Sequence, residues 1–293
     1  MKKVIRKIFL SNKLLSKLYI VCGKKKERIK FNKFMKFCSK RICDFAIDKV
    51  DEKEIMTNVP HDTIWFYWNT GRKCLPPIAE LCYKRDILLF GEKVTFLDSK
   101  SISLYCSFPD ELILKHKKGI IGEAHFSDLI RLQLLIRYGG VWADSTVYFS
   151  ENMPLNVYGS DLFVFKSNNN LADMANISNW FIVSKRRNII LEEVYFLLKE
   201  WWLQYNKSAG YLFFHWAFSF SSKRHINEWN KIPYIDNKLP HFIQHNLFYE
   251  TYDKEALASG LSKCFCHKFT LHYDTPPEES TLYKIVNCDN ILI

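Results

Sequence analysis

Three charged residues lie close together in an apolar part of the chain. Asp128 and Arg131 are three residues apart in the segment EAHFSDLIRLQLLIR (123–137), whose apolar spacing predicts a largely buried helix. This spacing puts both side chains on one side of the helix. Asp144 follows the run VWA (141–143), which predicts a short buried strand. Because an unpaired buried charge costs several kcal/mol, these residues need partners.

The junction between this helix and strand favours a functional site. Gly139 and Gly140 end the helix, where a residue of positive φ is needed. In an open α/β sheet, ligands bind at the carboxyl ends of the strands, which is where Asp144 lies. Two structural interpretations stay open: Asp128 and Arg131 could form an ion pair without a catalytic role, and Asp144 could cap a turn.

Strand and helix patterns alternate around this stretch. Such alternation favours a parallel sheet with helical crossovers, so the sequence predicts an α/β fold. The segment 226–251 is hard to assign because Pro233 and Pro240 break it, and 265–272 is predicted as a strand or an extended tail. Strands are predicted at 63–68, 93–97, 162–165 and 180–183, and helices at 77–89, 107–117, 189–205 and 211–220.

The first 50 residues carry the net positive charge of the chain. They hold 16 Lys/Arg and 3 Asp/Glu, whereas the whole chain has a net charge of +11, so the rest is close to neutral. Residues 2–21 have the spacing of an amphipathic helix, and a basic run interleaved with Phe31, Phe34 and Phe37 follows. We therefore predict a basic arm (1–55) that lies on an anionic membrane surface and one main domain (56–293). Packing of the arm on the domain and nucleic-acid binding are alternatives; no nucleic-acid-binding module accompanies the charge.

Composition and cysteine usage narrow the class further. Hydrophobic residues make up 48% and aromatic residues 16% of the chain, which excludes a disordered protein. Lys13 and Lys17 interrupt the longest apolar run near the start, so neither a membrane span nor a signal peptide is expected. Nine cysteines without a repeating spacing indicate reduced thiols. Cys264 and Cys266 beside His267 have no second ligand pair at zinc-module spacing.

The stretch HFSDLIRLQLLIRYGGVWADSTV (125–147) resembles the signature of the capsular polysaccharide synthesis glycosyltransferases. These are relatives of glycosyltransferases with a sugar-binding region that contains a DXD motif. The shared pattern is an Asp and an Arg on a helix, then Leu-Leu, Tyr-Gly-Gly, an aromatic residue and an acid. A looser resemblance extends from about residue 59 to 270. It implies a GT-A fold, a Rossmann-like sheet that binds a nucleotide-sugar.

The resemblance assigns donor-binding roles. Asp128 and Arg131 match the family's Asp and Arg, which would bind sugar hydroxyls and phosphate oxygens. The resemblance also implies a divalent cation, Mn²⁺ or Mg²⁺, on the diphosphate. Here the motif reads Asp144-Ser145-Thr146, so a hydroxyl replaces the second acid. Thr146 and His267 are the further candidate metal ligands, with His272 as the fallback, although an isolated histidine such as His267 could also be structural. Lys268 is the candidate for the diphosphate. Tyr67, Trp68 and Gly71 are the candidates for the nucleotide, although Tyr67 could equally belong to the core.

Acceptor binding is predicted from two further matches. Asn179 and Trp180 resemble the family's Asn-Trp-Phe, and a Trp beside a polar side chain suits stacking on a sugar face. Tyr211 and His215 resemble its Tyr-Phe-x-x-His pattern. His215 is a candidate base or hydroxyl partner, although a core histidine is an equal interpretation. His125 is a candidate to orient Asp144 or the donor. The predicted catalytic set is Asp128, Arg131, Asp144 and His215.

Together these features predict a hexosyltransferase-like glycosyltransferase. It would move a sugar from a nucleotide-sugar, expected to be UDP-linked, to a growing or lipid-linked surface glycan with retention of configuration. The expected location is the cytoplasm, peripherally on the inner face of the membrane. The alternative is a non-catalytic carbohydrate- or membrane-binding protein on a degenerate transferase fold, an interpretation that the missing second acid allows.

Overall fold

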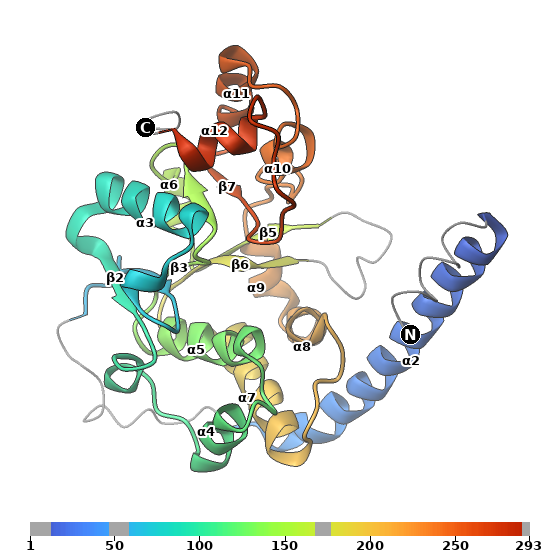
Figure 1. Ribbon diagram of the computed structural model, residues 1–293. Helices are drawn as coiled ribbons and strands as arrows, with labels where there is room; N and C mark the ends of the chain where they lie inside the picture. Colours follow the sequence, from blue (N-terminus) through green and yellow to red (C-terminus); the bar gives the residue numbers. More distant parts are fainter. Residues whose placement is uncertain (1–12, 47–58, 168–176, 289–293) are drawn as a thin grey trace.

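The computed structural model describes residues 13–46, 59–167 and 177–288, with residues 13–24 as backbone alone. A five-stranded sheet in the order β2-β1-β3-β6-β5 forms the centre (Figure 1). β2, β1 and β3 are parallel, and β6 is antiparallel to both β3 and β5. The α/β prediction is confirmed. The strands are β1 (Ile64–Tyr67), β2 (Val94–Leu97), β3 (Gly140–Ala143), β5 (Leu162–Lys166) and β6 (Ile177–Ser184).

The predicted parallel arrangement holds for β2, β1 and β3 but not for β6. Consecutive parallel strands need a crossover long enough for a helix, whereas β6 follows β5 after a short connection and turns back beside it. The predicted strands are otherwise confirmed, with β6 starting at Ile177, three residues before the predicted start at Trp180. In the 265–272 segment only β7 (Cys266–Lys268) is a strand.

Helices cover both faces of the sheet. α5 and α8 lie against one face, α7 packs on α5, α8 and α4, and α3 lies on the other side (Figure 1). The predicted helices are confirmed with shifts of a few residues at their ends. They are α3 (Pro77–Phe90), α4 (Asp110–Lys117), α5 (Glu123–Arg137), α7 (Ile189–Gln204) and α8 (Phe213–Arg224). The short helices α6 (Leu155–Tyr158) and α9 (Ile226–Lys231) were not predicted.

Alternate residues of the strands pack in two separate hydrophobic cores, one on each face of the sheet. Trp65 and Trp142 belong to the core shared with α5 and α7, whereas Ile64 and Val141 belong to the core on the opposite face. All four side chains are buried. A sheet covered on both faces needs apolar residues at successive positions, which explains why the sequences of these strands are continuous apolar runs.

A third core organises the C-terminal part. β4 (Val147–Phe149) follows the turn after Asp144 and pairs antiparallel with β7, so that Val147 lies opposite Lys268. Tyr148, Phe248 and Phe269 are buried together beneath the small helices of this part, which form the top of Figure 1. Those helices are α10 (Phe242–Asn246), α11 (Lys254–Leu261) and α12 (Thr281–Asn287).

The N-terminal helix α2 (Lys13–Arg41) is longer than the predicted helix, and part of it packs on the main domain. Phe34 is fully buried and contacts Trp201 and Phe213, while the ring of Phe31 meets that of Trp216. The C-terminal half of α2 therefore packs on the main domain. Residues 2–12 of the predicted helix and the predicted boundary after residue 55 lie outside the described residues. Among the described helices, none has the length and apolarity needed to cross a membrane.

The two glycines after α5 bring β3 against β1. Gly139 and Gly140 have φ of +75° and +92°, as the predicted helix end requires. A Cβ on Gly140 would lie 2.3 Å from the carbonyl oxygen of Thr63. Since that oxygen accepts the hydrogen bond from the Val141 amide, backbone and not a movable side chain blocks the space.

We expect Gly140→Ala to lower the free energy of unfolding by about 2 kcal/mol or more, because it adds left-handed strain and a backbone clash. Urea unfolding followed by circular dichroism measures this change. Gly122→Ala is the matched control: Gly122 has φ of −69°, and a Cβ added there would meet no atom within 4 Å. Equal stability of both variants would contradict the proposed role of Gly140.

Candidate active site

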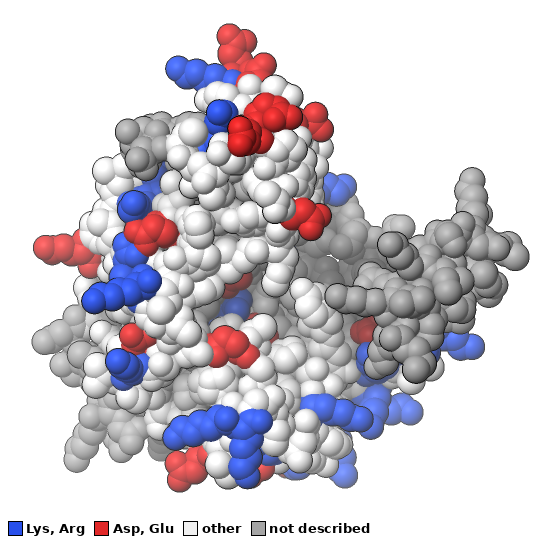
Figure 2. Space-filling model, viewed as in Figure 1, with Lys and Arg blue, Asp and Glu red and all other residues white. Residues whose placement is uncertain are grey.

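A cavity of about 750 Å³ opens at the carboxyl ends of β1 and β3. Figure 2 shows a hollow on this face of the molecule with charged groups of both signs inside it. Its walls come from the loop after β1, the first half of α5, the turn after β3, and the segment after β7. Most of the predicted site residues line it: Tyr67, Trp68, Asp128, Arg131, Asp144, Thr146, Asn179, Tyr211, His215 and Lys268.

Arg131 connects the helix to both neighbouring strands. Its guanidinium lies 3.3 Å from Asp128 Oδ1 and 3.4 Å from Asp144 Oδ1. It also donates to the backbone carbonyl of Asn179 on β6 and lies over the ring of Trp142, 4.9 Å from the centroid. The Arg131 side chain is only 5% exposed. The ion pair predicted by spacing therefore extends to the strand-end acid, which joins the predicted groups into one cluster.

Asp128 is held by a second contact from β6. The Asn179 amide donates from Nδ2 to Asp128 Oδ1 at 3.0 Å. His125 Nδ1 lies 3.6 Å from the other carboxylate oxygen, too far for a good hydrogen bond. His125 thus lies beside Asp128 rather than Asp144. Asp128 and Asn179 together present one carboxylate and one amide to the cavity.

Asp144 is an ionised acid between two cations. Trp142 Nε1 donates to Oδ1 at 2.8 Å, and Lys268 Nζ lies 3.3 Å from Oδ2. Burial tends to raise the pKa of Asp144, but the charges of Lys268 and Arg131, with the hydrogen bonds from Trp142 and Lys268, outweigh it and lower this pKa. The carboxylate therefore stays charged at neutral pH.

The predicted metal shell is not assembled in this structure. His267 is fully buried, and its Nε2 lies 3.0 Å from the carbonyl of Leu261. Successive residues of a strand point to opposite faces, so Lys268, and not His267, reaches the cavity from β7. Burial lowers the pKa of His267 to about 4, which makes it a neutral core histidine. His272, the fallback ligand, does line the cavity.

The groups present do not fit a divalent-cation site. The described residues contain no group of three or more His, Cys, Asp or Glu side chains with the geometry to hold a metal ion. Asp144 and Thr146 are the two predicted oxygen ligands, and the ammonium of Lys268 contacts both. The eight cysteines whose side chains are described are all free.

Two further predicted site residues do not line the cavity. Trp180 is buried in the core opposite α5, where it stacks on Phe165 at 5.0 Å between centroids, so it does not line the cavity. Gly71 is also absent from the cavity wall. With φ of +89°, it serves the turn after β1 and lies close to Asp98.

The residues of the predicted base platform are linked to an acid that the sequence prediction missed. The Tyr67 hydroxyl donates to Glu123 Oε1 at 2.8 Å, and Asn69 Nδ2 donates to Glu123 Oε2 at 2.8 Å. Trp68 lies beside them and donates from Nε1 to the Cys74 carbonyl. Glu123 begins α5. Its position at the start of the 123–137 segment, which carries Asp128 and Arg131, is the sequence signal that could have identified it. Ser127, His241 and Gln244 also line the cavity without having been predicted.

Tyr211 and His215 lie on the predicted acceptor side. Tyr211 is 89% exposed at the rim, whereas His215 is deeper and lies near Asp128 and Arg131. Burial lowers the pKa of His215 to about 4, with the charges of Asp128 and Arg131 acting in opposite directions. A neutral imidazole with so low a pKa is a weak proton acceptor and suits hydrogen bonding to a hydroxyl better.

Comparison with known proteins gives the family. The family model described as "Capsular polysaccharide synthesis protein" matches residues 14–286. The chain belongs to this family. Among solved structures, it is similar to "PaToxG Glycosyltransferase", with a TM-score of 0.40 and 15% identity over 70% of this chain and 80% of that one. No curated protein matches. The mixed sheet flanked by helices is consistent with a GT-A-like fold.

The placement of His267 in the core makes a prediction that separates stability from activity. His267→Gln should leave donor turnover within about threefold of wild type, because the side chain does not line the cavity. Because the pKa of His267 is lower in the folded protein, its imidazole is protonated in the unfolded chain but not in the folded one between pH 6.5 and about 4. His267 therefore lowers the free energy of unfolding as the pH falls through that window. The variant should lose less stability there.

Urea unfolding at pH 7 and pH 5, together with donor turnover, measures both effects. The exposed His61→Gln is the control, since it should follow wild type. A reduction of turnover by more than about tenfold in a folded His267→Gln protein would show that His267 acts in the active site.

Proposed function

We propose that the chain is a hexosyltransferase-like glycosyltransferase that uses a nucleotide-sugar, expected to be UDP-linked, to extend a growing or lipid-linked surface glycan. The observation that carries this proposal is the cluster of Asp128, Arg131, Asp144 and Lys268 in the cavity at the strand ends. Membership of the capsular polysaccharide synthesis family supports it.

The cavity has separate groups for each part of such a donor. Arg131 and Lys268 supply positive charge for a diphosphate. Asp128 and Asn179 supply an acceptor and a donor of hydrogen bonds for sugar hydroxyls. Tyr67 and Trp68, next to Glu123, supply an aromatic and polar wall for the nucleoside.

The acceptor is assigned to the open side of the cavity, near Tyr211 and His215. The exposed Tyr211 ring offers an apolar face on which a sugar can stack. The neutral imidazole of His215 is suited to orient an acceptor hydroxyl. For a retaining reaction, that hydroxyl attacks the anomeric carbon from the face that the diphosphate leaves.

The competing proposal is a non-catalytic carbohydrate-binding protein on a degenerate transferase fold. The hydroxyl at Thr146 in place of a second acid is the feature that favours it. Consumption of nucleotide-sugars separates the two: a binding protein should release no nucleoside diphosphate above background. A thermal-shift screen of nucleotide-sugars identifies the donor first, since a ligand that binds the folded state raises the melting temperature.

We expect Asp144→Asn to reduce transfer by about 100-fold or more, because the neutral amide no longer holds the two cations beside the donor. Nucleoside diphosphate release measures this loss. Asp161→Asn, which removes an exposed carboxylate paired with Lys185, is the control and should keep wild-type turnover. Turnover above a tenth of wild type in a folded Asp144→Asn protein would contradict the proposed role of Asp144 in transfer.

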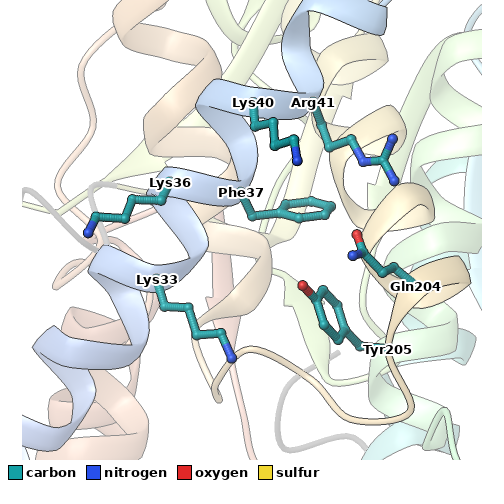
Figure 3. Close-up of a pocket in the computed structure, with 7 residues that line it drawn as sticks. All are labelled: Lys33, Lys36, Phe37, Lys40, Arg41, Gln204 and Tyr205. Carbon is teal, nitrogen blue, oxygen red and sulfur yellow. The ribbon is translucent and has the colours of Figure 1, made fainter.

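We also propose that α2 holds the protein on an anionic membrane surface. Its outer side carries a row of exposed basic residues, whereas Phe31 and Phe34 face the protein. Between α2 and the end of α7 lies a groove of about 330 Å³, lined by Lys33, Lys36, Phe37, Lys40, Arg41, Gln204 and Tyr205 (Figure 3). Basic groups around an aromatic floor suit the phosphate headgroups of anionic lipids.

The membrane proposal predicts that Lys33→Gln, Lys36→Gln and Lys40→Gln together weaken salt-sensitive binding to vesicles by about 100-fold, since each basic residue near an anionic surface contributes about 1 kcal/mol. Co-sedimentation with vesicles of neutral and anionic phospholipids measures this. A variant with Lys84, Lys117 and Lys118 changed to Gln has the same charge and is the control. Equal binding by both variants would show that general charge, and not α2, drives association. Substitution is preferable to truncation because α2 contributes Phe34 to the core.

A further inference from the structure

We infer that Lys268 takes the place of the divalent cation, so that this chain activates the donor diphosphate with two side-chain cations, Lys268 and Arg131. This inference rests on the proposed glycosyl transfer and deepens it. It follows from three features of the cluster: the position of the Lys268 ammonium, the charge of the groups that hold it, and the way β7 fixes it.

The Lys268 ammonium lies where a cation would bridge the acid and hydroxyl of the motif. Nζ is 3.3 Å from Asp144 Oδ2 and contacts Thr146 Oγ1. An ammonium has three N–H donors. Asp144 and Thr146 take two of them, and no other described residue is an acceptor for the third. That third donor is available to a phosphate oxygen in the cavity, which Lys268 lines.

The charges of this group suit an ammonium better than a dication. Mn²⁺ and Mg²⁺ favour several oxygen ligands, with carboxylates to balance their charge. Here Asp144 supplies one negative charge and Thr146 supplies a neutral hydroxyl. One carboxylate balances one ammonium. A dication bound to the same two oxygens would lie next to Lys268 and would be repelled by it.

Backbone pairing fixes Lys268 in this position. The antiparallel register of β4 and β7 puts Val147 opposite Lys268. On either side, the Lys268 amide donates to the Pro240 carbonyl and the Phe269 amide donates to the Thr146 carbonyl, both at 2.9 Å. The side chain is 18% exposed. The backbone pairing fixes the Cα of Lys268, and the contacts of Nζ with Asp144 and Thr146 fix the far end of the side chain, so it loses little freedom when it binds an anion.

In the reaction, the bond between the anomeric carbon and the diphosphate oxygen breaks, and its electron pair stays on the diphosphate. The acceptor hydroxyl oxygen forms the new bond to that carbon. Its proton passes to the departing phosphate oxygen on the same face and then to solvent. Lys268 and Arg131 stabilise the growing negative charge of the leaving group and keep their own protons throughout.

Removal of metal ions from the full-length wild-type protein tests the inference directly. The protein is dialysed against excess EDTA, and consumption of the nucleotide-sugar found in the donor screen is followed with EDTA, Mn²⁺ or Mg²⁺. We expect turnover to change by less than about threefold. A larger loss that Mn²⁺ or Mg²⁺ restores would overturn the inference and leave glycosyl transfer intact.

Substitution of Lys268 gives an independent test. Lys268→Met should lower turnover by about 100-fold or more, and should weaken binding of the nucleoside diphosphate product in EDTA, measured by calorimetry. Lys117→Met, a change at an exposed lysine on α4, is the control. Binding in EDTA that is unchanged in a folded Lys268→Met protein would overturn the inference. If no nucleotide-sugar is consumed under any metal condition, the proposed function falls and this inference falls with it.

Discussion

The fold depends on how the charge of one buried side chain, the guanidinium of Arg131, is balanced. Arg131 is held by Asp128 on its own helix, by Asp144 after β3 and by the Asn179 carbonyl on β6. A buried charge costs several kcal/mol unless each of these partners is present. The requirement therefore fixes α5, β3 and β6 relative to one another at the strand ends. The same compensation leaves Asp128, Asp144 and Asn179 facing a shared cavity, so the interaction that orders the fold also builds the site.

The pairing of β4 with β7 supplies the remaining charge. Lys268 reaches the cavity because a segment far along the chain folds back beside the turn that carries Asp144 and Thr146. The C-terminal core of Tyr148, Phe248 and Phe269 holds this pairing in place. The C-terminal part therefore forms one wall of the site and contributes a cation to it.

The N-terminal helix α2 has an exposed basic side and a buried aromatic side. Its basic side is exposed, as an interaction with an anionic surface requires, yet Phe31, Phe34 and Cys38 are buried against α7 and α8. α8 also carries His215 to the cavity. α2 therefore packs directly on the helix that carries His215.

The sequence by itself determined the parts that depend on local geometry. Helical spacing placed Asp128 beside Arg131, the glycine pair located the end of α5, and the apolar run before Asp144 placed this acid at a strand end; most strands and helices were predicted for the same reason. Only the tertiary structure decided which of His267 and Lys268 enters the cavity, that Trp180 is core, and that β6 runs antiparallel. These outcomes depend on strand register and on contacts between segments far apart in the chain, where a shift of one residue exchanges the buried and exposed faces.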